Sequence, residues 1–170
     1  GMYLYLKKAL PDAQIDVYLE KPADIFDCIH GIEDVRTDCS KDCVYDVFIV
    51  LDTSKERLGD AEKYFRTAKK TINVDHHISN TNFAKENIVK ANASSTCEIL
   101  CELLPMDKIG TFSAIAFYTG IIHDTGVFKH SNTTKETMEI AGKLIAFGIP
   151  FGKIIDDSFY RKTYKQLQIM

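Results

Sequence analysis

The stretch TINVDHH at residues 71–77 decides the expected fold, because a short apolar run ends there in three side chains that can contact metal or phosphate. Upstream, DVFIVLD at residues 46–52 ends in Asp52, and downstream GIIHDTG at residues 120–126 runs into Asp124. In an open parallel sheet, ligands bind beyond the carboxyl ends of the strands. We therefore expect three strand endings to converge on one site, although the sequence separates them.

The composition is that of one folded domain. The chain has 170 residues, of which 45% are hydrophobic and 26% are charged, values close to the average for globular proteins. A net charge of −3 argues against broad binding of duplex DNA, but a small anionic substrate is compatible with it if metal ions supply positive charge. No apolar stretch approaches the ~20 residues of a membrane span, and no signal peptide pattern opens the chain. Five cysteines without framework spacing favour a reducing compartment, so we expect a cytoplasmic protein.

Strands and helices are expected to alternate along the chain. The expected strands cover residues 14–19, 47–51, 71–74, 87–90 and 120–122. The expected helices cover residues 2–10, 54–70, 94–104, 107–118, 135–147 and a segment from 151 toward the C-terminus, with 22–30 as a short helix or loop. The unbroken apolar run 47–51 predicts a strand buried on both faces. This order predicts a parallel, Rossmann-like sheet flanked by helices in three layers, within a single domain over residues 1–170.

The residues at the strand ends are candidate metal ligands. Asp52 could be a carboxylate ligand, even one that bridges two divalent ions, although an acidic residue after a strand also serves as a turn or capping residue. Adjacent residues of an extended chain point in opposite directions, so we expect one of His76 and His77 to face a metal and the other a substrate. Imidazole suits Mn, Fe or Zn better than Mg.

Further residues are candidates for supporting roles. Asp75 could orient an imidazole. Ser95 and Thr96 begin a helix, where backbone N–H groups could hold a phosphate, although capping alone explains them equally well. His130 lies six residues after Asp124 and could reach a substrate.

Several enzyme classes have no support in the sequence. The chain has neither a Gly-x4-Gly-Lys-Ser/Thr loop nor a Gly-x-Gly-x2-Gly turn, and it has no Gly-x-Ser-x-Gly elbow for serine hydrolysis. Asp-Thr-Gly at residues 124–126 also occurs in aspartic proteases, but that chemistry needs two such aspartates.

Four segments, taken together, resemble the DHH phosphoesterases, especially the oligoribonuclease and pAp (3'-phosphoadenosine 5'-phosphate) phosphatase branch. They are VLDTS at 50–54, VDHHISN at 74–80, ASSTCEIL at 93–100 and GIIHDTGVFKHSNTT at 120–134. The resemblance implies a hydrolase with two metal ions, usually Mn²⁺, with Mg²⁺ or Co²⁺ as alternatives. It implies a bridging role for Asp52, ligand roles for His76 and Asp124, and a catalytic His77 that faces the scissile phosphate.

The chain departs from the family pattern at both ends. The family's first motif, a His followed by Asp-x-Asp after the first strand, is absent, and so is the C-terminal DHHA1 domain. We therefore expect a fragment of the DHH domain that lacks the first strand and the first metal motif, and that binds at most one metal ion, weakly.

The resemblance implies a small nucleotide or a short single-stranded oligonucleotide as the substrate, and a homodimer is left open. Alternatives within the same chemistry are hydrolysis of cyclic dinucleotides, hydrolysis of pyrophosphate and exonuclease action on single strands. An alternative from another class is a catalytically silent interaction or regulatory module.

Overall fold

The computed structural model describes residues 1–27 and 29–161. Its α-helices are α1 (Met2–Ala9), α2 (Glu62–Thr67), α3 (Thr96–Leu103), α4 (Thr111–Asp124), α5 (Lys135–Ile145) and α6 (Phe151–Ile155). Its strands are β1 (Val17–Tyr18), β2 (Val35–Arg36), β3 (Val47–Leu51), β4 (Lys70–Asp75) and β5 (Glu86–Val89). Short 3-10 turns occur at Asp24–Phe26, Ile32–Asp34, Lys55–Arg57, Gly59–Ala61 and Met106–Lys108, and a π-helical turn follows α6 at Asp156–Tyr160.

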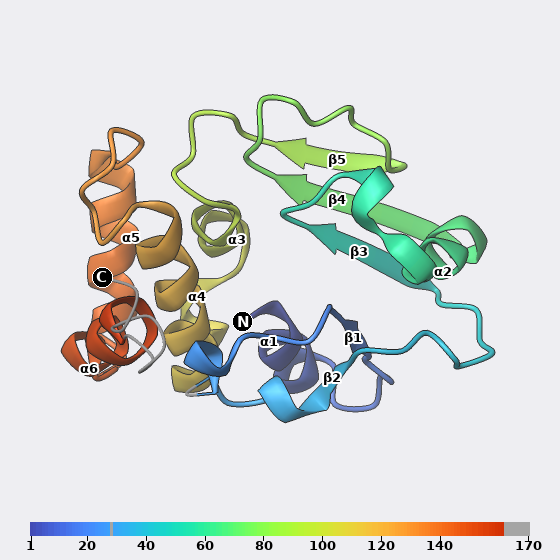
Figure 1. Ribbon diagram of the computed structural model, residues 1–170, viewed down its shortest axis with the longest axis horizontal. Helices are drawn as coiled ribbons and strands as arrows, with labels where there is room; N and C mark the ends of the chain where they lie inside the picture. Colours follow the sequence, from blue (N-terminus) through green and yellow to red (C-terminus); the bar gives the residue numbers. More distant parts are fainter. Residues whose placement is uncertain (28, 162–170) are drawn as a thin grey trace, which may run out of the picture.

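All strand pairs within the described residues are parallel, as the sequence predicts. One sheet has the order β3-β4-β5, and β1 pairs with β2 in a second sheet. Figure 1 shows α2 over one face of the three-stranded sheet. Helix α3 lies beside the carboxyl ends of β3, β4 and β5, which the arrowheads mark (Figure 1). The parallel, helix-flanked α/β fold class is therefore confirmed. No helix in the described ranges is both long and apolar enough to cross a bilayer.

The main core lies among the helices and not inside the three-stranded sheet. The fully buried side chains of α3, α4 and α5 include Ile99, Phe117, Tyr118, Ile121, Ile122 and Leu144. Helix α4 lies at its centre, because apolar side chains surround this helix and a helix of that kind is stable only when buried.

Two expectations about apolar runs are wrong. Residues 120–122, expected to form a strand, belong to α4, which continues to Asp124. A short apolar run cannot distinguish a buried strand from a buried helix. In β3, expected to be buried on both faces, Val50 is buried but Val47 is 45% exposed, because β3 is the edge strand of the described sheet.

The helix predictions were right in kind and less accurate in extent. The helix expected over residues 54–70 consists of two 3-10 turns followed by α2. The expected helix after residue 151 is present as α6 and the π-helical turn, and its continuation beyond residue 161 lies outside the described residues, as does Cys28 within the expected helix or loop 22–30.

Candidate metal and phosphate site

Two neighbouring parallel strands bring the first site residues together. Leu51 of β3 lies opposite Val74 of β4 in the register of the sheet. Asp52 follows β3 with a φ of 58°, and its backbone N–H donates to the carbonyl of Val74 at 3.1 Å. Aspartate tolerates this left-handed conformation better than most residues. The turn places Asp52 at the carboxyl edge of the sheet, next to the end of β4.

Asp52, His76 and His77 form a close group at this edge. Their ligand atoms all lie within 4.8 Å of one another. The Nε2 atom of His76 lies 3.4 Å from Oδ1 of Asp52, and Nδ1 of His77 lies 3.8 Å from the same oxygen. Thr96, at the start of α3, donates its hydroxyl to that oxygen at 2.8 Å. The expected convergence of the strand endings of β3 and β4 is therefore observed.

The two imidazoles do not point in opposite directions, contrary to expectation. Their ring centroids lie 4.6 Å apart, and both rings lie near Asp52. The alternation rule does not apply because β4 ends at Asp75, and both histidines belong to the turn that follows. One imidazole cannot therefore be assigned to the metal and the other to the substrate from strand geometry alone.

His76 is held so that one nitrogen faces Asp52. Its Nδ1 lies 3.4 Å from the carbonyl oxygen of Ala93, which can only accept a hydrogen bond. With the proton on Nδ1, the lone pair of Nε2 is directed to the side of Asp52, and this is the form in which a neutral imidazole binds metal.

Asp75 is a buried carboxylate that organises the turn. Its Oδ1 accepts hydrogen bonds from the backbone N–H of His76 at 2.7 Å, from that of His77 at 3.1 Å and from Nδ1 of His77 at 2.7 Å. Burial opposes ionisation of Asp75, but the hydrogen bonds from Asn80 and His77 outweigh it and lower its pKa. The same Asp75 bond raises the pKa of His77. Asp75 thus has the orienting position that was expected of it.

Asp124 approaches the site from the C-terminal end of α4, not from a strand. Burial raises its pKa, and the charge of Asp52 raises it further, while His76 and His77 oppose the shift. Asp52 and Asp124 line a common cavity of about 300 Å³, whose apolar wall includes Leu51, Leu100 and Phe117. Among the described side chains, the close group around Asp52 does not include Asp124. It is an electrostatic neighbour of the group and shares its cavity.

A strained turn follows Asp124. Gly126, Val127 and Phe128 all have positive φ values, of 55°, 56° and 63°, and this conformation is costly for a β-branched residue such as Val127. A Cβ atom on Gly126 would collide with the ring of His130. The ring of His130 therefore packs directly on this backbone, with Nδ1 3.2 Å from the carbonyl oxygen of Asp124.

The remaining candidates have structural partners. Ser95 is buried and caps α3 by accepting from the backbone N–H of Glu98 at 3.0 Å. The carboxylate of Glu98 does not reach back to this cap, since it bonds Ser94 and Thr137. A phosphate role for Ser95, Thr96 or His130 stays a prediction.

Sequence reasoning missed two groups of polar residues that support the site. Asn132 donates to the carbonyls of Ser94 and Asp124 at 3.0 and 3.3 Å, which ties the α3 loop to the end of α4. Asn80 and Asn73 lie behind Asp75. Asparagine is so common in turns that only the structure could separate these from ordinary turn residues.

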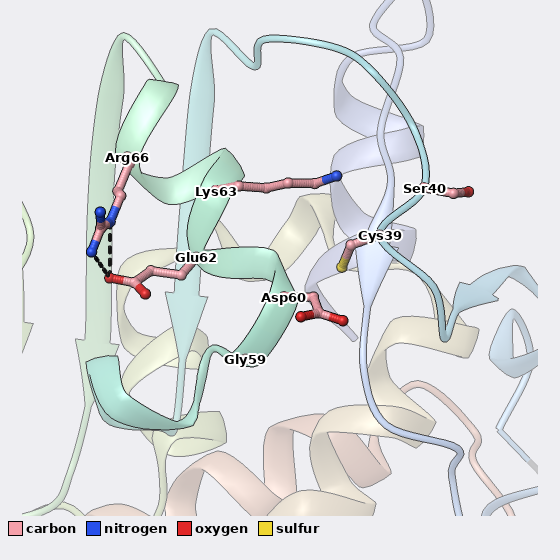
Figure 2. A pocket seen from close by; sticks show the side chains of 7 residues that line it. All are labelled: Cys39, Ser40, Gly59, Asp60, Glu62, Lys63 and Arg66. Carbon is pink, nitrogen blue, oxygen red and sulfur yellow. Dashed lines mark hydrogen bonds and ion pairs between the residues drawn. The ribbon is translucent and has the colours of Figure 1, made fainter.

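A second hollow of about 620 Å³ lies outside this site. Figure 2 shows Lys63 extending from α2 toward the loop of Cys39 and Ser40, and Arg66 paired with Glu62. Its walls carry side chains of both charges, and none of the expected site residues lines it. It is therefore separate from the site at the sheet edge.

The donor set at the sheet edge fits a divalent cation. Imidazole nitrogen and carboxylate oxygen within one close group are the mixed ligands that first-row metals accept, and they are less suited to Mg²⁺. Because Nδ1 of His77 is bonded to Asp75, His77 could contribute only Nε2.

The fold and site define a class of protein: a parallel α/β domain with histidine and carboxylate side chains at the carboxyl edge of its sheet. Residues 1–121 match the model of the DHH family, N-terminal domain. The chain belongs to the DHH family, in agreement with the sequence resemblance.

Two relatives are named bifunctional oligoribonuclease and PAP phosphatase NrnA. The one from Thermus thermophilus is 30% identical over 92 residues, which cover 53% of this chain and 28% of the relative. The one from Bacillus subtilis is 31% identical over 119 residues, which cover 67% of this chain and 38% of the relative. The chain thus matches less than half of each relative's length.

Two solved structures share the fold. An exopolyphosphatase-related protein from Bacteroides fragilis superposes with a TM-score of 0.82 at 21% identity, over 98% of this chain and 54% of that one. A putative family II inorganic pyrophosphatase from Methanococcus jannaschii gives a TM-score of 0.50 at 23% identity, over 68% of this chain and 44% of that one. At these identities the likeness concerns the fold alone.

Proposed function

We propose that this chain carries part of the active site of a manganese-dependent phosphoesterase, which hydrolyses short oligonucleotides, pAp or both. The observation that carries the proposal is the close group of Asp52, His76 and His77 at the carboxyl edge of the sheet. Membership of the DHH family and the likeness to relatives named oligoribonuclease and PAP phosphatase support the choice of substrate.

Each residue has a role that its surroundings support. Asp52, His76 and Asp124 would hold the cation, which when bound would polarise phosphoryl oxygens and lower the pKa of a water molecule. His77 would face the phosphate. Because Asp75 raises the pKa of His77, its imidazole stays protonated to a higher pH, where it can stabilise negative charge or protonate a leaving oxygen.

We further propose that residues outside this chain complete the metal site. Within the described residues, β3 has a strand neighbour on one side only, and so does β1. Tyr18 of β1 contacts Tyr45, just before β3, without pairing of the two strands. The unpaired edge of β3 and the apolar cavity beside Leu51 would accept one more strand, whose carboxyl end would reach Asp52 and Asp124.

The test is manganese-dependent release of phosphate from pAp and of mononucleotide from a dinucleotide. We expect little turnover by the 170-residue chain and clear turnover by a form extended at both ends. In the extended form, His76→Ala or Asp124→Ala should abolish activity. If both variants keep full turnover, the ligand assignment is wrong. If the extended form binds Mn²⁺ but hydrolyses neither substrate, the silent regulatory module becomes the better account.

A further inference from the structure

The carboxylate of Asp75 uses its two oxygens for different purposes. Oδ1 accepts the three hydrogen bonds from His76 and His77, and Oδ2 accepts from Nδ2 of Asn80 at 2.6 Å. Asp75 is only 2% exposed, so water cannot replace this partner freely. Asn80 is therefore the partner of the one carboxylate oxygen that His76 and His77 do not bond.

Asn80 is itself held by a hydrogen-bonded row of two further asparagines, Asn73 on β4 and Asn87 on β5. Its Oδ1 accepts from Nδ2 of Asn73 at 2.9 Å, and Nδ2 of Asn73 also approaches Oδ1 of Asn87 at 3.2 Å. Asn73 is fully buried in β4. Asn87 is fixed in turn by the backbone of Ala84, to which it donates at 2.7 Å.

The carboxylate of Asp75 fixes which side of the Asn80 amide faces it. An ionised carboxylate can only accept, so the NH₂ group of Asn80 must face Asp75. Toward Asn73 the two amides bond reciprocally, because Nδ2 of Asn73 donates to Oδ1 of Asn80 at 2.9 Å and Nδ2 of Asn80 donates to Oδ1 of Asn73 at 3.5 Å. The same carboxylate forces the ring of His77 to donate from Nδ1, which leaves Nε2 as the nitrogen available to a ligand.

We propose that Asn80 is a positioning residue, which acts through Asp75 to hold the ring of His77 with Nδ1–H on Asp75, so that Nε2 is directed to the phosphate and can donate to it when the imidazole is protonated. The catalytic meaning of this arrangement rests on the proposed function, but the arrangement itself does not. Asn80 could instead serve only the turn, since its Oδ1 also accepts from the backbone N–H of Asn82 at 2.9 Å. The two roles differ in what they do to the tautomer of His77.

The test is ¹⁵N NMR of the imidazoles in the metal-free, 170-residue chain, with the His77 signal assigned by its loss in His77→Gln. At pH ~9, where an ordinary imidazole is neutral, we expect at least a tenfold excess of the Nδ1–H form, about the ratio that one charge-assisted hydrogen bond supports. Asn80→Ala removes the donor, and Asn80→Asp replaces it with a group that can only accept. Either variant should lower the excess about fivefold or more.

Asn82→Gly is the matched control, because it removes an asparagine from the same turn at a position with a φ of 54°, which glycine tolerates. It should leave the His77 signal unchanged. The proposal is overturned if the unmodified chain carries the proton on Nε2, or if a folded Asn80 variant keeps the Nδ1–H form. Since neither metal nor substrate is present, failure of the chain as a phosphoesterase leaves this result unaffected.

Discussion

At the scale of single residues, the site combines one strained and one buried carboxylate. Asp52 adopts a left-handed conformation, and Asp75 is almost completely buried. Both features are costly for an isolated side chain. The backbone hydrogen bond to Val74 offsets the strain of Asp52, and four hydrogen bonds offset the cost of burying the carboxylate of Asp75. The polar residues of the site are thus fixed before any ligand arrives.

The Asp75–His77 pair predicts a pH window for stability. The pKa of Asp75 is lowered from 3.8, so its stabilisation is present above pH 3.8 and is lost as the pH falls through the folded pKa. The pKa of His77 is raised from 6.5, so its stabilisation is present below pH 6.5 and is lost as the pH rises through the folded pKa. Both contributions are complete between pH 3.8 and 6.5.

Urea unfolding across this range, with a chelator present, measures the window. The stability difference between the unmodified chain and Asp75→Asn should be greatest inside the window and should shrink on both sides. His77→Gln should remove only the alkaline decline. A difference that does not change with pH would show that the pair does not form.

At the scale of elements, the packing of the site's helices depends on two features. Helices α3 and α4 pass very close to each other, and a buried carboxylate on α3 bonds α5. Helix α4, which ends in Asp124, passes close to α3 at Gly120, where a side chain would collide with Cys97. The Glu98 carboxylate of α3 accepts from the hydroxyls of Ser94 at 2.5 Å and Thr137 at 2.6 Å, and so joins α3 to α5.

Gly120→Ala should destabilise the fold by about 1–3 kcal/mol, because the added methyl group overpacks the contact between α3 and α4. Gly142→Ala is the control, because Gly142 lies inside α5 with nothing near its position for a Cβ atom. That variant should stabilise the fold by about 0.5–1 kcal/mol. Thermal and urea unfolding measure the stability of both variants. If Gly120→Ala leaves the free energy of unfolding unchanged, α3 and α4 do not pack as closely as the structure shows.

Glu98→Ala should lower the free energy of unfolding by about 1–3 kcal/mol, since it leaves two buried hydroxyls without their acceptor. Glu102→Ala is the control on the same helix, because this residue makes only a partly exposed ion pair with Lys90. The control should change the free energy of unfolding by no more than about 1 kcal/mol. Equal effects of the two variants would mean that the link between α3 and α5 is weak.

At the scale of the whole molecule, part of the arrangement could be predicted from the sequence. Asp52 and the Asp-His-His segment follow apolar runs that do form neighbouring parallel strands, so their convergence could be predicted from strand endings alone. The run before Asp124 is equally apolar but is helical. Whether such a run is strand or helix depends on what packs around it, which the run itself does not encode.

The finer features of the site depend on long-range contacts. The direction of His76 depends on its contacts with Asp52 and Ala93. The position of Asn80 depends on Asn73 in β4, which itself contacts Asn87 of β5. Neither follows from local pattern.

We propose that Asp52, His76 and Asp124 share one cation at the carboxyl edge of the sheet. Calorimetric titration of the 170-residue chain with Mn²⁺ tests it most directly. We predict a single weak site whose heat disappears in His76→Ala and in Asp124→Asn but persists in Asp46→Asn, a change to an exposed carboxylate outside the site. Two tight sites per chain, or binding that survives the loss of His76, would show that these three residues do not form one shared cation site.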